Sequence, residues 1–384
     1  MPDITALAQE RNQLFEDLLS GRIPRRVPIN INIPSEFAIQ YAGRDLLQVQ
    51  WNTPLFEEVM EKVCENFVTD TMPVRIARWP SVYRILGARN FVMGSNGIIQ
   101  HPEVEGLLSE EWDAFIASPY DCLVEKILPR LYPELDRKPG QKAITLAKAF
   151  KAWSDEATTT RALYGKMTDK YGYAGLSFTS GACVAPFDYI ADELRGFKGI
   201  LTDVRRMPEK VLAAADVATE LMIKMGTPVM INGVSSTFIP LHMAPYMREK
   251  DFEKLYWPSL KKLVEGLAAK GQPAYLFVEQ DWSRFIDYLA ELPENTRLRF
   301  EYGDPRVVKE KLGKKHILTG FYPLTLLTLG TKQQCIDKAK EILEIMAPGG
   351  KYFFEFDKIP LTVDSVNVEN LQAVLEYVAT NAKY

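Results

Sequence analysis

The second half of the chain alternates between short apolar runs and longer stretches in which apolar residues recur at helical spacing. The best-defined helix begins at a capping box of Thr331 and Gln334 and ends at Gly349-Gly350. Strands separated by helices of this length indicate βαβ units and a parallel sheet. The five apolar runs predicted to be strands are 238–242, 274–279, 297–302, 316–321 and 351–356.

Three more strands are predicted upstream, at 25–31, 73–77 and 174–179. Eight strands that alternate with helices are what a (β/α)8 barrel requires, so we predict an α/β fold of the TIM-barrel type. An open, doubly wound sheet is the alternative. The barrel is favoured because no glycine-rich phosphate-binding turn follows the first strand.

Two segments are predicted to lie outside the barrel itself. Residues 1–21 are polar with a helical pattern, which predicts an N-terminal helical extension. Residues 80–170 form an insertion between the second and third strands, with a predicted hairpin turn at 94–97 and a helical region at 110–134. We therefore expect residues 1–384 to form a single barrel domain, with residues 80–170 as a lid or docking surface over its top.

Composition and charge indicate which partners and which cellular location to expect. The net charge is −4, and no long basic run is present, so nucleic acid is not an expected partner. The N-terminus lacks the basic and apolar segments of a signal peptide, and no apolar run approaches the ~20 residues that span a membrane. The cysteines are widely spaced, which predicts free thiols and a cytoplasmic location; they are Cys64, Cys122, Cys183 and Cys335.

Polar residues close several of the predicted strands, at the end of a barrel where catalytic groups lie. These are His242, Glu279, Glu301 and Asp357. Because a buried carboxylate needs a partner, three interpretations stay open for Glu279 and Glu301. They are ligands of a divalent metal, an acid–base pair, or carboxylates paired with a nearby Arg or Lys, of which Arg297 and Arg299 are close in sequence. His242 is either a ligand or a structural residue, whereas His316 begins its strand and is predicted to be structural.

Aromatic and sulfur-containing side chains also follow or belong to predicted strands. An apolar pocket of such residues would suit a flat, ring-bearing substrate, although core packing explains the same pattern. The residues predicted to line the pocket are Phe178, Phe238, Met243, Tyr302 and Phe321.

The segment 320–378 resembles the C-terminal end of the uroporphyrinogen decarboxylase superfamily. The resemblance rests on a strand ending at Gly320-Phe321, a helix start at Gly330-Thr331, the Ala-Pro-Gly-Gly stop at 347–350 and Glu369-Asn370-Leu371 in the last helix. It extends over roughly residues 175–380. In the decarboxylases an Arg-Gln-Ala-Gly-Arg-Tyr-like segment follows the first strand. Residues 32–37 here read Asn-Ile-Pro-Ser-Glu-Phe, which argues against porphyrinogen decarboxylation.

The other branch of the superfamily transfers methyl groups to or from corrinoid proteins and uses zinc. Relative to its thiol-methylating members, Phe277 stands at the His ligand, and Glu279 and Asp357 stand at the two Cys ligands. An oxygen-rich site would suit polarising an ether oxygen rather than a thiol. The stretch 196–322 looks most like the corrinoid-dependent O-demethylase methyltransferases of anaerobic bacteria.

The resemblance implies a zinc-dependent transfer of a methyl group from a phenyl methyl ether, such as a guaiacol, veratrol or vanillate-type methoxyarene. The acceptor would be the cob(I)alamin of a separate corrinoid protein, since no Asp-x-His-x-x-Gly segment for the cofactor occurs here. Zinc would be held by Glu279 and Glu301, with His242 or Asp357 as third ligand. The alternatives are a cofactor-free, decarboxylase-like lyase and a non-catalytic binding partner of a corrinoid protein.

Overall fold

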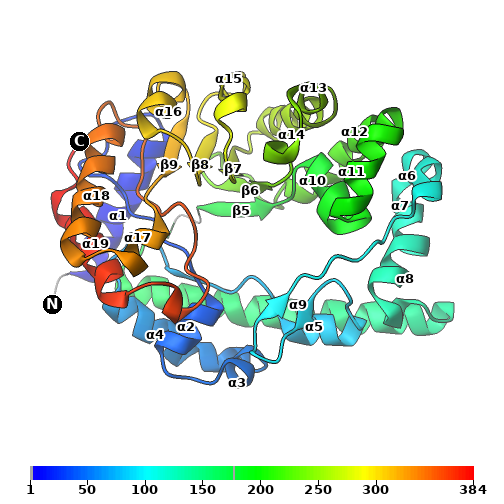
Figure 1. Cartoon of the computed structure of the whole chain (residues 1–384). Coiled ribbons are helices and arrows are strands. Elements are labelled where there is room, and N and C mark those ends of the chain that lie inside the picture. The colour runs from blue at the N-terminus through cyan, green and yellow to red at the C-terminus, as the bar shows by residue number, and fades with distance from the viewer. Residues whose placement is uncertain (1–2, 176–177) are drawn as a thin grey trace.

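The computed structural model describes residues 3–175 and 178–384. Its centre is a parallel sheet in which five strands lie side by side in chain order, with helices outside them (Figure 1). Chain order and spatial order coincide because each strand is followed by a helical crossover to the next, as in successive βαβ units. The strands are β5 (Thr179–Ala182), β6 (Ser236–Leu241), β7 (Ala274–Val278), β8 (Arg297–Phe300) and β9 (Ile317–Gly320).

Shorter contacts continue the order beyond both edges of this sheet. Two further strands, β1 (Ile33–Pro34) and β2 (Val74–Arg75), pair in parallel. The N–H of Ala174 donates to the C=O of Asp70 at 2.8 Å, which connects the second strand region to the segment before β5. Isolated parallel bridges join residues 352–356 to both neighbours; they are Leu318–Tyr352, Tyr322–Phe356 and Ile29–Phe354. The neighbour order is that of the predicted α/β barrel, and the fold class is confirmed.

The predicted strands of the second half agree best with the structure. The predictions at 238–242, 274–279, 297–302 and 316–321 match β6 to β9 within two residues at either end. By contrast, 351–356 and 25–31 pair only through isolated bridges, and the second strand has only two residues. The third strand was predicted too early, since β5 begins at Thr179. Residues 176 and 177 of that prediction lie outside the described residues.

Helices cover the outside of the sheet and close the chain. The capping box that was predicted for α18 is present: Gln334 N donates to Thr331 Oγ1 at 3.3 Å, and Thr331 N to Gln334 Oε1 at 2.8 Å. The helices of this half are α10 (Pro186–Asp188), α11 (Phe197–Arg206), α12 (Pro208–Gly226), α13 (Glu249–Asp251), α14 (Trp257–Ala269), α15 (Ile286–Leu289), α16 (Pro305–Leu312), α17 (Leu324–Leu329), α18 (Lys332–Met346) and α19 (Val368–Asn381).

The predicted N-terminal helix closes the amino-terminal end of the sheet. Phe15 and Leu18 of this helix are buried in one apolar cluster with Phe178, Tyr275 and Phe353. Phe178 meets the rings of Phe15, Tyr275 and Phe353 edge-on, the arrangement that aromatic pairs prefer. The helices of the first part of the chain are α1 (Ile4–Leu19), α2 (Ser35–Tyr41), α3 (Leu46–Gln50) and α4 (Phe56–Asn66).

The insertion between the second and third strands reaches from one side of the barrel to the other. Figure 1 shows the long α9 running opposite β5, while α6 lies beside α12. The predicted hairpin at 94–97 is present, formed by β3 and β4. The predicted helical region 110–134 is interrupted once, at Ser118; residues 119–131 stay helical, because a π-helical turn at Leu123–Ile127 joins α7 to α8. The elements are α5 (Pro80–Leu86), β3 (Val92–Met93), β4 (Ile99–Gln100), α6 (Trp112–Ala117), α7 (Pro119–Cys122), α8 (Leu128–Leu131) and α9 (Pro139–Tyr171).

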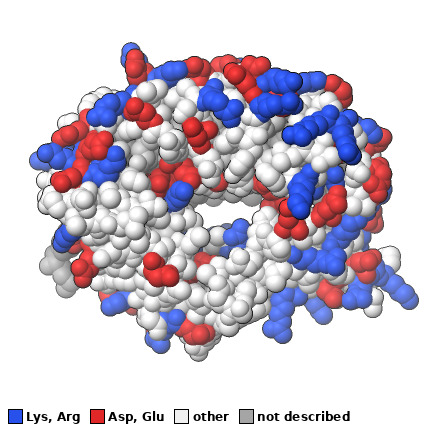
Figure 2. All heavy atoms as spheres, viewed as in Figure 1, with Lys and Arg blue, Asp and Glu red and all other residues white. Residues whose placement is uncertain are grey.

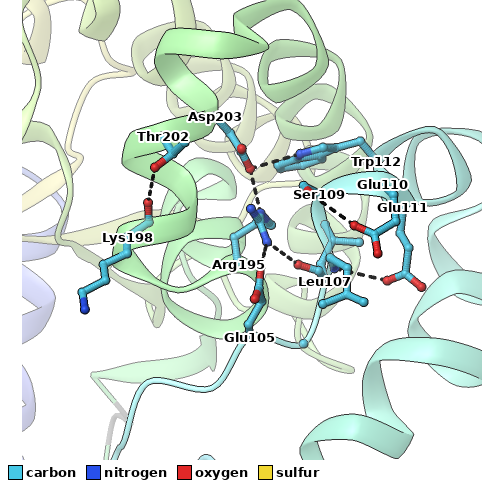
Figure 3. Close-up of polar contacts among 12 residues, drawn as sticks. Glu105, Leu107, Ser109, Glu110, Glu111, Trp112, Arg195, Lys198, Thr202 and Asp203 are labelled. Atoms are coloured by element: carbon cyan, nitrogen blue, oxygen red, sulfur yellow. Dashed lines mark hydrogen bonds and ion pairs between the residues drawn. The ribbon is translucent and has the colours of Figure 1, made fainter.

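A buried ion pair anchors the insertion to the barrel helices (Figure 3). Arg195 Nε donates to Asp203 Oδ2 at 2.7 Å, and Trp112 Nε1 donates to the same oxygen at 3.1 Å. Arg195 also donates to the carbonyl of Leu107 at 2.7 Å and pairs with Glu105. Charge-assisted hydrogen bonds of this kind hold two elements in one geometry, so the far end of the insertion is fixed against α11.

The four cysteines are buried and unpaired, as the sequence predicted. No helix within the described residues is long and apolar enough to cross a membrane.

Gly320 ends β9 at a point where only glycine fits. Its φ is +94°, and a Cβ placed there would lie 2.2 Å from the carbonyl oxygen of Phe300. We expect Gly320→Ala to lower the free energy of unfolding by at least about 2 kcal/mol, because it adds a clash to backbone strain. Gly349→Ala is the matched control, since Gly349 has φ +80° but nothing within 4 Å of its Cβ position. Equal losses in chemical denaturation of the two variants would contradict the role of the close contact.

Candidate active site

The register of the sheet places the predicted polar residues at one level. Leu241 of β6 pairs with Val278, Val278 with Phe300, and Phe300 with Gly320. The next residue on each strand therefore follows at the carboxyl edge, where neighbouring strands lie about 4.8 Å apart. These residues are His242, Glu279, Glu301 and Phe321. The sequence alone predicted all four for this edge.

His242 lies between two carboxylates. Its Nδ1 is 2.5 Å from Oδ2 of Asp192, and its Nε2 is 3.2 Å from Oε1 of Glu279. Burial of the imidazole opposes the charged form, but hydrogen bonds to Asp192 and Glu279 outweigh it and raise the pKa of His242 to about 11. The ring is consequently an imidazolium that bridges the segment after α10 and the end of β7.

Asp188 holds the turn that positions His242. Its fully buried carboxylate accepts hydrogen bonds from the backbone N–H of His242 at 2.9 Å and of Met243 at 3.0 Å. The hydroxyl of Tyr256 donates to it at 2.7 Å. Burial, followed by repulsion from Asp192, raises the pKa of Asp188 to about 7. Asp188 therefore fixes the backbone at the end of β6 and with it the direction of the imidazole.

Glu301 and Asp357 have other partners. Glu301 accepts from Lys358 Nζ at 2.6 Å and from the N–H of Gln280 at 2.8 Å. Asp357 Oδ1 accepts from the N–H groups of Leu324 at 2.8 Å and of Lys358 at 2.6 Å. The carboxylate of Asp357 thus satisfies the free amide at the start of α17. Burial raises the pKa of Asp357.

The four predicted metal ligands are therefore not gathered around one point. His242 and Glu279 face each other, Glu301 faces Lys358, and Asp357 is bound by backbone amides. Across residues 3–175 and 178–384, no group of three or more His, Cys, Asp or Glu side chains has the arrangement of a metal site. Two donors meet, and the other two would have to leave their present partners to join them.

The alternative in which the glutamates pair with an Arg or Lys is confirmed in part: Glu301 pairs with Lys358, whereas Arg297 and Arg299 have other partners. Arg299 Nε donates to the carbonyl of Phe356 at 3.1 Å, and Arg297 donates to the carbonyl of Phe178 at 3.1 Å. Both arginines sit deeper in the barrel than the glutamates, because residues two apart on a strand share a face but not a level. The cations that meet the glutamates are His242 and Lys358.

The five residues of the predicted aromatic pocket are spread over the fold. Phe178 and Phe238 belong to the apolar cluster at the opposite, amino-terminal end. Met243 is buried in the core, whereas Tyr302 is exposed. Phe321 stacks on Phe300 with ring centroids 5.2 Å apart. The prediction fails as a single pocket because strand position was inferred without register. Only Phe321 stands at the level of His242 and Glu279.

Figure 2 shows an opening through the middle of the molecule, which in the view of Figure 1 lies between β5 and α9. Uncharged side chains make up much of its border, and some acidic and basic side chains also lie at its edge. Ser180 and Ala182 of β5 are exposed. The insertion therefore encloses a space beside the sheet rather than packing flat onto it.

Comparison with known proteins agrees with this arrangement. The family model described as "Uroporphyrinogen decarboxylase (URO-D)" matches residues 176–380. The chain belongs to the uroporphyrinogen decarboxylase family.

A similarity in fold extends over nearly the whole chain. The structure is similar to the solved structure of a methyltransferase from Methanosarcina mazei, with a TM-score of 0.62 and 15% sequence identity. The match covers 97% of this chain and 98% of the other. No curated protein sequence matches the chain. The resemblance inferred from residues 320–378 is thus confirmed at the level of the family.

Three residues around the site of this family member escaped sequence reasoning: Asp188, Asp192 and Lys358. The two aspartates lie four residues apart in Asp-Tyr-Ile-Ala-Asp, just after the third strand. That spacing puts both on one side of a helical turn, which was the available signal. Lys358 directly follows Asp357, but nothing in the sequence indicated that its ammonium would face Glu301.

Replacing Asp192 tests what keeps His242 charged. Asp192→Asn removes the carboxylate at Nδ1, so we expect the pKa of His242 to fall from about 11 towards its usual 6.5. NMR titration of the imidazole resonances measures this. The stabilisation from the charged ring is complete below pH 6.5 and is lost as the pH rises towards 11, so the stability difference between the two proteins should narrow over that window. Asp155→Asn, which changes an exposed aspartate, is the control; an unchanged pKa in Asp192→Asn would refute the assignment.

Proposed function

We propose that the chain is a methyltransferase that takes a methyl group from a phenyl methyl ether, of the guaiacol, veratrol or vanillate type. The acceptor is the cob(I)alamin carried by a separate corrinoid protein. The contact between His242 Nε2 and Glu279 Oε1 at the strand ends, at 3.2 Å, carries this proposal. It is supported by the family and by the fold that the chain shares with a protein named as a methyltransferase.

Zinc is the proposed cofactor, and the residues fit it in part. A His nitrogen and a Glu oxygen converge, and both are donors that zinc accepts. Asp192 stands on the other ring nitrogen, which is how outer carboxylates orient zinc-binding histidines. We propose His242 and Glu279 as two ligands, with Glu301 as a third once it exchanges Lys358 for the metal. Asp357 is the weaker candidate, because two backbone amides already occupy its Oδ1.

Zinc, when bound, supplies a Lewis acid that polarises the ether oxygen. The side chains of this protein orient the reacting groups and enclose the substrate. Asp188 and Asp192 fix the imidazole of His242 from two sides. Lys358 brings a positive charge beside Glu301, where it can stabilise negative charge on a departing phenoxide. Phe321, stacked on Phe300, offers an apolar wall at the same level for the substrate ring.

A metal-free reaction is the second candidate, and the protonation of His242 favours it. With a pKa near 11, His242 carries a proton on Nε2 that it can donate to a carbanion or to a leaving oxygen. A cofactor-free, decarboxylase-like lyase would use it in this way. A non-catalytic partner of a corrinoid protein is the third candidate. We also propose a cytoplasmic location, supported by the buried free thiols.

Metal content separates the first two candidates. In protein purified without chelators, we expect about one zinc per chain, and a large loss of it in Glu279→Gln, since an amide oxygen is a much poorer ligand than a carboxylate. Elemental analysis measures both. Glu344→Gln, on the exposed face of α18, is the control and should keep its metal. Wild-type protein that binds no metal when zinc is supplied would favour the lyase.

Turnover separates both enzymes from the binding partner. We expect a panel of methoxyarenes with cob(I)alamin, assayed without oxygen, to identify substrates that lose their methyl group. Removing a Lewis-acid ligand typically costs several kcal/mol of transition-state stabilisation, so turnover by Glu279→Gln should fall at least about 100-fold. Binding of the variant to the corrinoid protein should stay unchanged. If no ether is demethylated while the corrinoid protein still binds, the non-catalytic role is supported instead.

A further inference from the structure

Tyr256 is a fully buried side chain with contacts to both sides of the pair formed by His242 and Glu279. Its hydroxyl donates to Oδ2 of Asp188 at 2.7 Å, and the same oxygen accepts from the backbone N–H of His242 at 2.9 Å. Its ring meets the ring of Trp282 edge-on, with centroids 6.0 Å apart. Trp282 stands three residues after Glu279, in the loop that follows β7. One side chain therefore connects the backbone of His242, through Asp188, to the loop behind Glu279.

A π-helical turn brings Tyr256 into the interior. The helix α13, the π-helical turn Phe252–Tyr256 and the helix α14 follow one another directly along the chain. Because a π-turn takes up one residue more than an α-helical turn, it changes which side chains face inward. Leu255, Tyr256 and Trp257 are consecutive and all buried, whereas consecutive residues of a regular α-helix point about 100° apart. The wide turn is what allows Tyr256 to reach Asp188.

A second π-helical turn, Tyr189–Arg195, carries the carboxylate on the other side of His242. Asp192 belongs to this turn, and its Oδ2 lies 2.5 Å from Nδ1 of the imidazole. Residues 3–175 and 178–384 contain three π-helical turns, of which the third, Leu123–Ile127, lies in the insertion. Such turns recur at functional sites. Two of the three deliver a side chain to the same histidine, one directly and one through Asp188.

Aromatic packing fixes the ring of Tyr256 in place. It stacks on Phe252 with centroids 5.5 Å apart, and it lies 5.6 Å from the ring of Phe187, which directly precedes Asp188. Close packing on several sides leaves the ring in a single orientation. Burial raises the pKa of its hydroxyl well above the ordinary value, so the group keeps its proton and remains a donor to Asp188.

We propose that Tyr256 is a positioning residue that sets the separation of His242 and Glu279. Through its hydroxyl and Asp188 it fixes the backbone of His242, and through its ring and Trp282 it supports the loop behind Glu279. Because it is fully buried, it acts through these neighbours. The inference rests on the proposed function, in which His242 and Glu279 bind zinc, but the geometry that it predicts can be measured without turnover.

Tyr256→Phe tests this role, because it removes the hydroxyl and keeps the ring. A hydrogen bond to a charged group is worth at least about a factor of ten in an equilibrium constant, so amide exchange at His242 and Met243 should quicken by about that factor once Asp188 is held less firmly. Among the three histidines of the chain, only His242 should shift its imidazole signals in a proton–nitrogen correlation NMR spectrum. Zinc affinity should fall about tenfold, as is typical for residues that support a ligand.

Tyr322→Phe is the matched control. Tyr322 is equally buried, and its hydroxyl donates to the carbonyl of Cys335 at 3.0 Å. This variant should lose stability but leave the His242 signals and the zinc affinity unchanged. Unaltered His242 signals and amide exchange in Tyr256→Phe would overturn the proposal. If those signals move as expected while even the wild type binds no zinc, the positioning role stands and the zinc mechanism fails.

A second variant keeps the test decisive if Tyr256→Phe does not fold. Trp282 Nε1 has no hydrogen-bond partner among the described residues, so Trp282→Phe breaks no hydrogen bond and only leaves a gap behind the loop after Glu279. We expect the Nε2 signal of His242 to shift and zinc affinity to fall, while the amides of His242 and Met243, which Asp188 holds, stay protected from exchange. A His242 spectrum identical to that of the wild type would show that the ring contact does not set the separation.

Discussion

The parallel register of β6 to β9 is the constraint on which the rest of the structure depends. Phe238 pairs with Tyr275, Tyr275 with Arg297, and Arg297 with Ile317. Alternate residues of each strand face the barrel interior, so they form layers. The lowest layer, the floor, contains Phe238, Tyr275 and Arg297. Two residues further along the strands, Phe277 and Arg299 form the middle layer, and two residues beyond them lie His242 and Glu279. A slip of one residue would turn the catalytic candidates outward and bury others in their place. The close approach of Gly320 to Phe300, which leaves no room for a Cβ, is part of the same register.

The charged side chains of the three interior layers differ in the partners that they have. In the middle layer, Glu355 is buried and accepts from Tyr275 and Asn30, with the positive charge of Arg299 nearby. That carboxyl group is balanced inside the fold, so it is structural. In the floor, Arg297 has only neutral partners. At the top, the charges meet solvent and the space enclosed by the insertion. The same strands thus carry a buried carboxyl group with partners in the middle layer, an arginine with neutral partners in the floor and a cluster of charged side chains at the top.

A strand or helix could be predicted from sequence when the residues that define it lie close together in the chain. The strands β6 to β9 were found because apolar runs, helix caps and glycine stops lie close together in sequence. In the first half, β2 lies inside the predicted 73–77 and Ile29 of 25–31 forms a bridge, but the pairing covers only one or two residues, too few to impose a clear period on the sequence. The helix of residues 119–131 begins at Pro119 and ends before Pro133, because proline favours a first helical turn and cannot continue a helix; Pro129 is accommodated next to the π-helical turn Leu123–Ile127.

For the site, the residues at the strand ends could be predicted, but the side chains that they contact could not. His242, Glu279 and Glu301 could be assigned to one edge, because the carboxyl ends of parallel strands converge. That Asp192 faces His242 and that Lys358 faces Glu301 depends on contacts between residues 50 and 57 positions apart. No periodic pattern encodes such contacts. The prediction of an arginine partner used sequence proximity, which is misleading on a strand, where residues two apart are about 6.6 Å apart in depth.

The charge balance at the top of the barrel argues for a further cation there. Five carboxyl groups, of Asp188, Asp192, Glu279, Glu301 and Asp357, lie near three cationic side chains: His242 and Lys358, which form ion pairs, and Arg299, whose charge acts on Asp357. Even with Asp188 half-protonated near neutral pH, negative charge is in excess. Low-dielectric surroundings strengthen this field, and the proton held on His242 offsets part of it; burial separately raises the pKa values of Asp188 and Asp357. A divalent cation that takes the place of the proton on His242 would relieve the same excess without protonating a carboxylate. The charge excess is thus one argument for the proposed zinc, and the proton on His242 is the argument for the metal-free alternative; zinc would have to displace that proton and take Glu301 from Lys358.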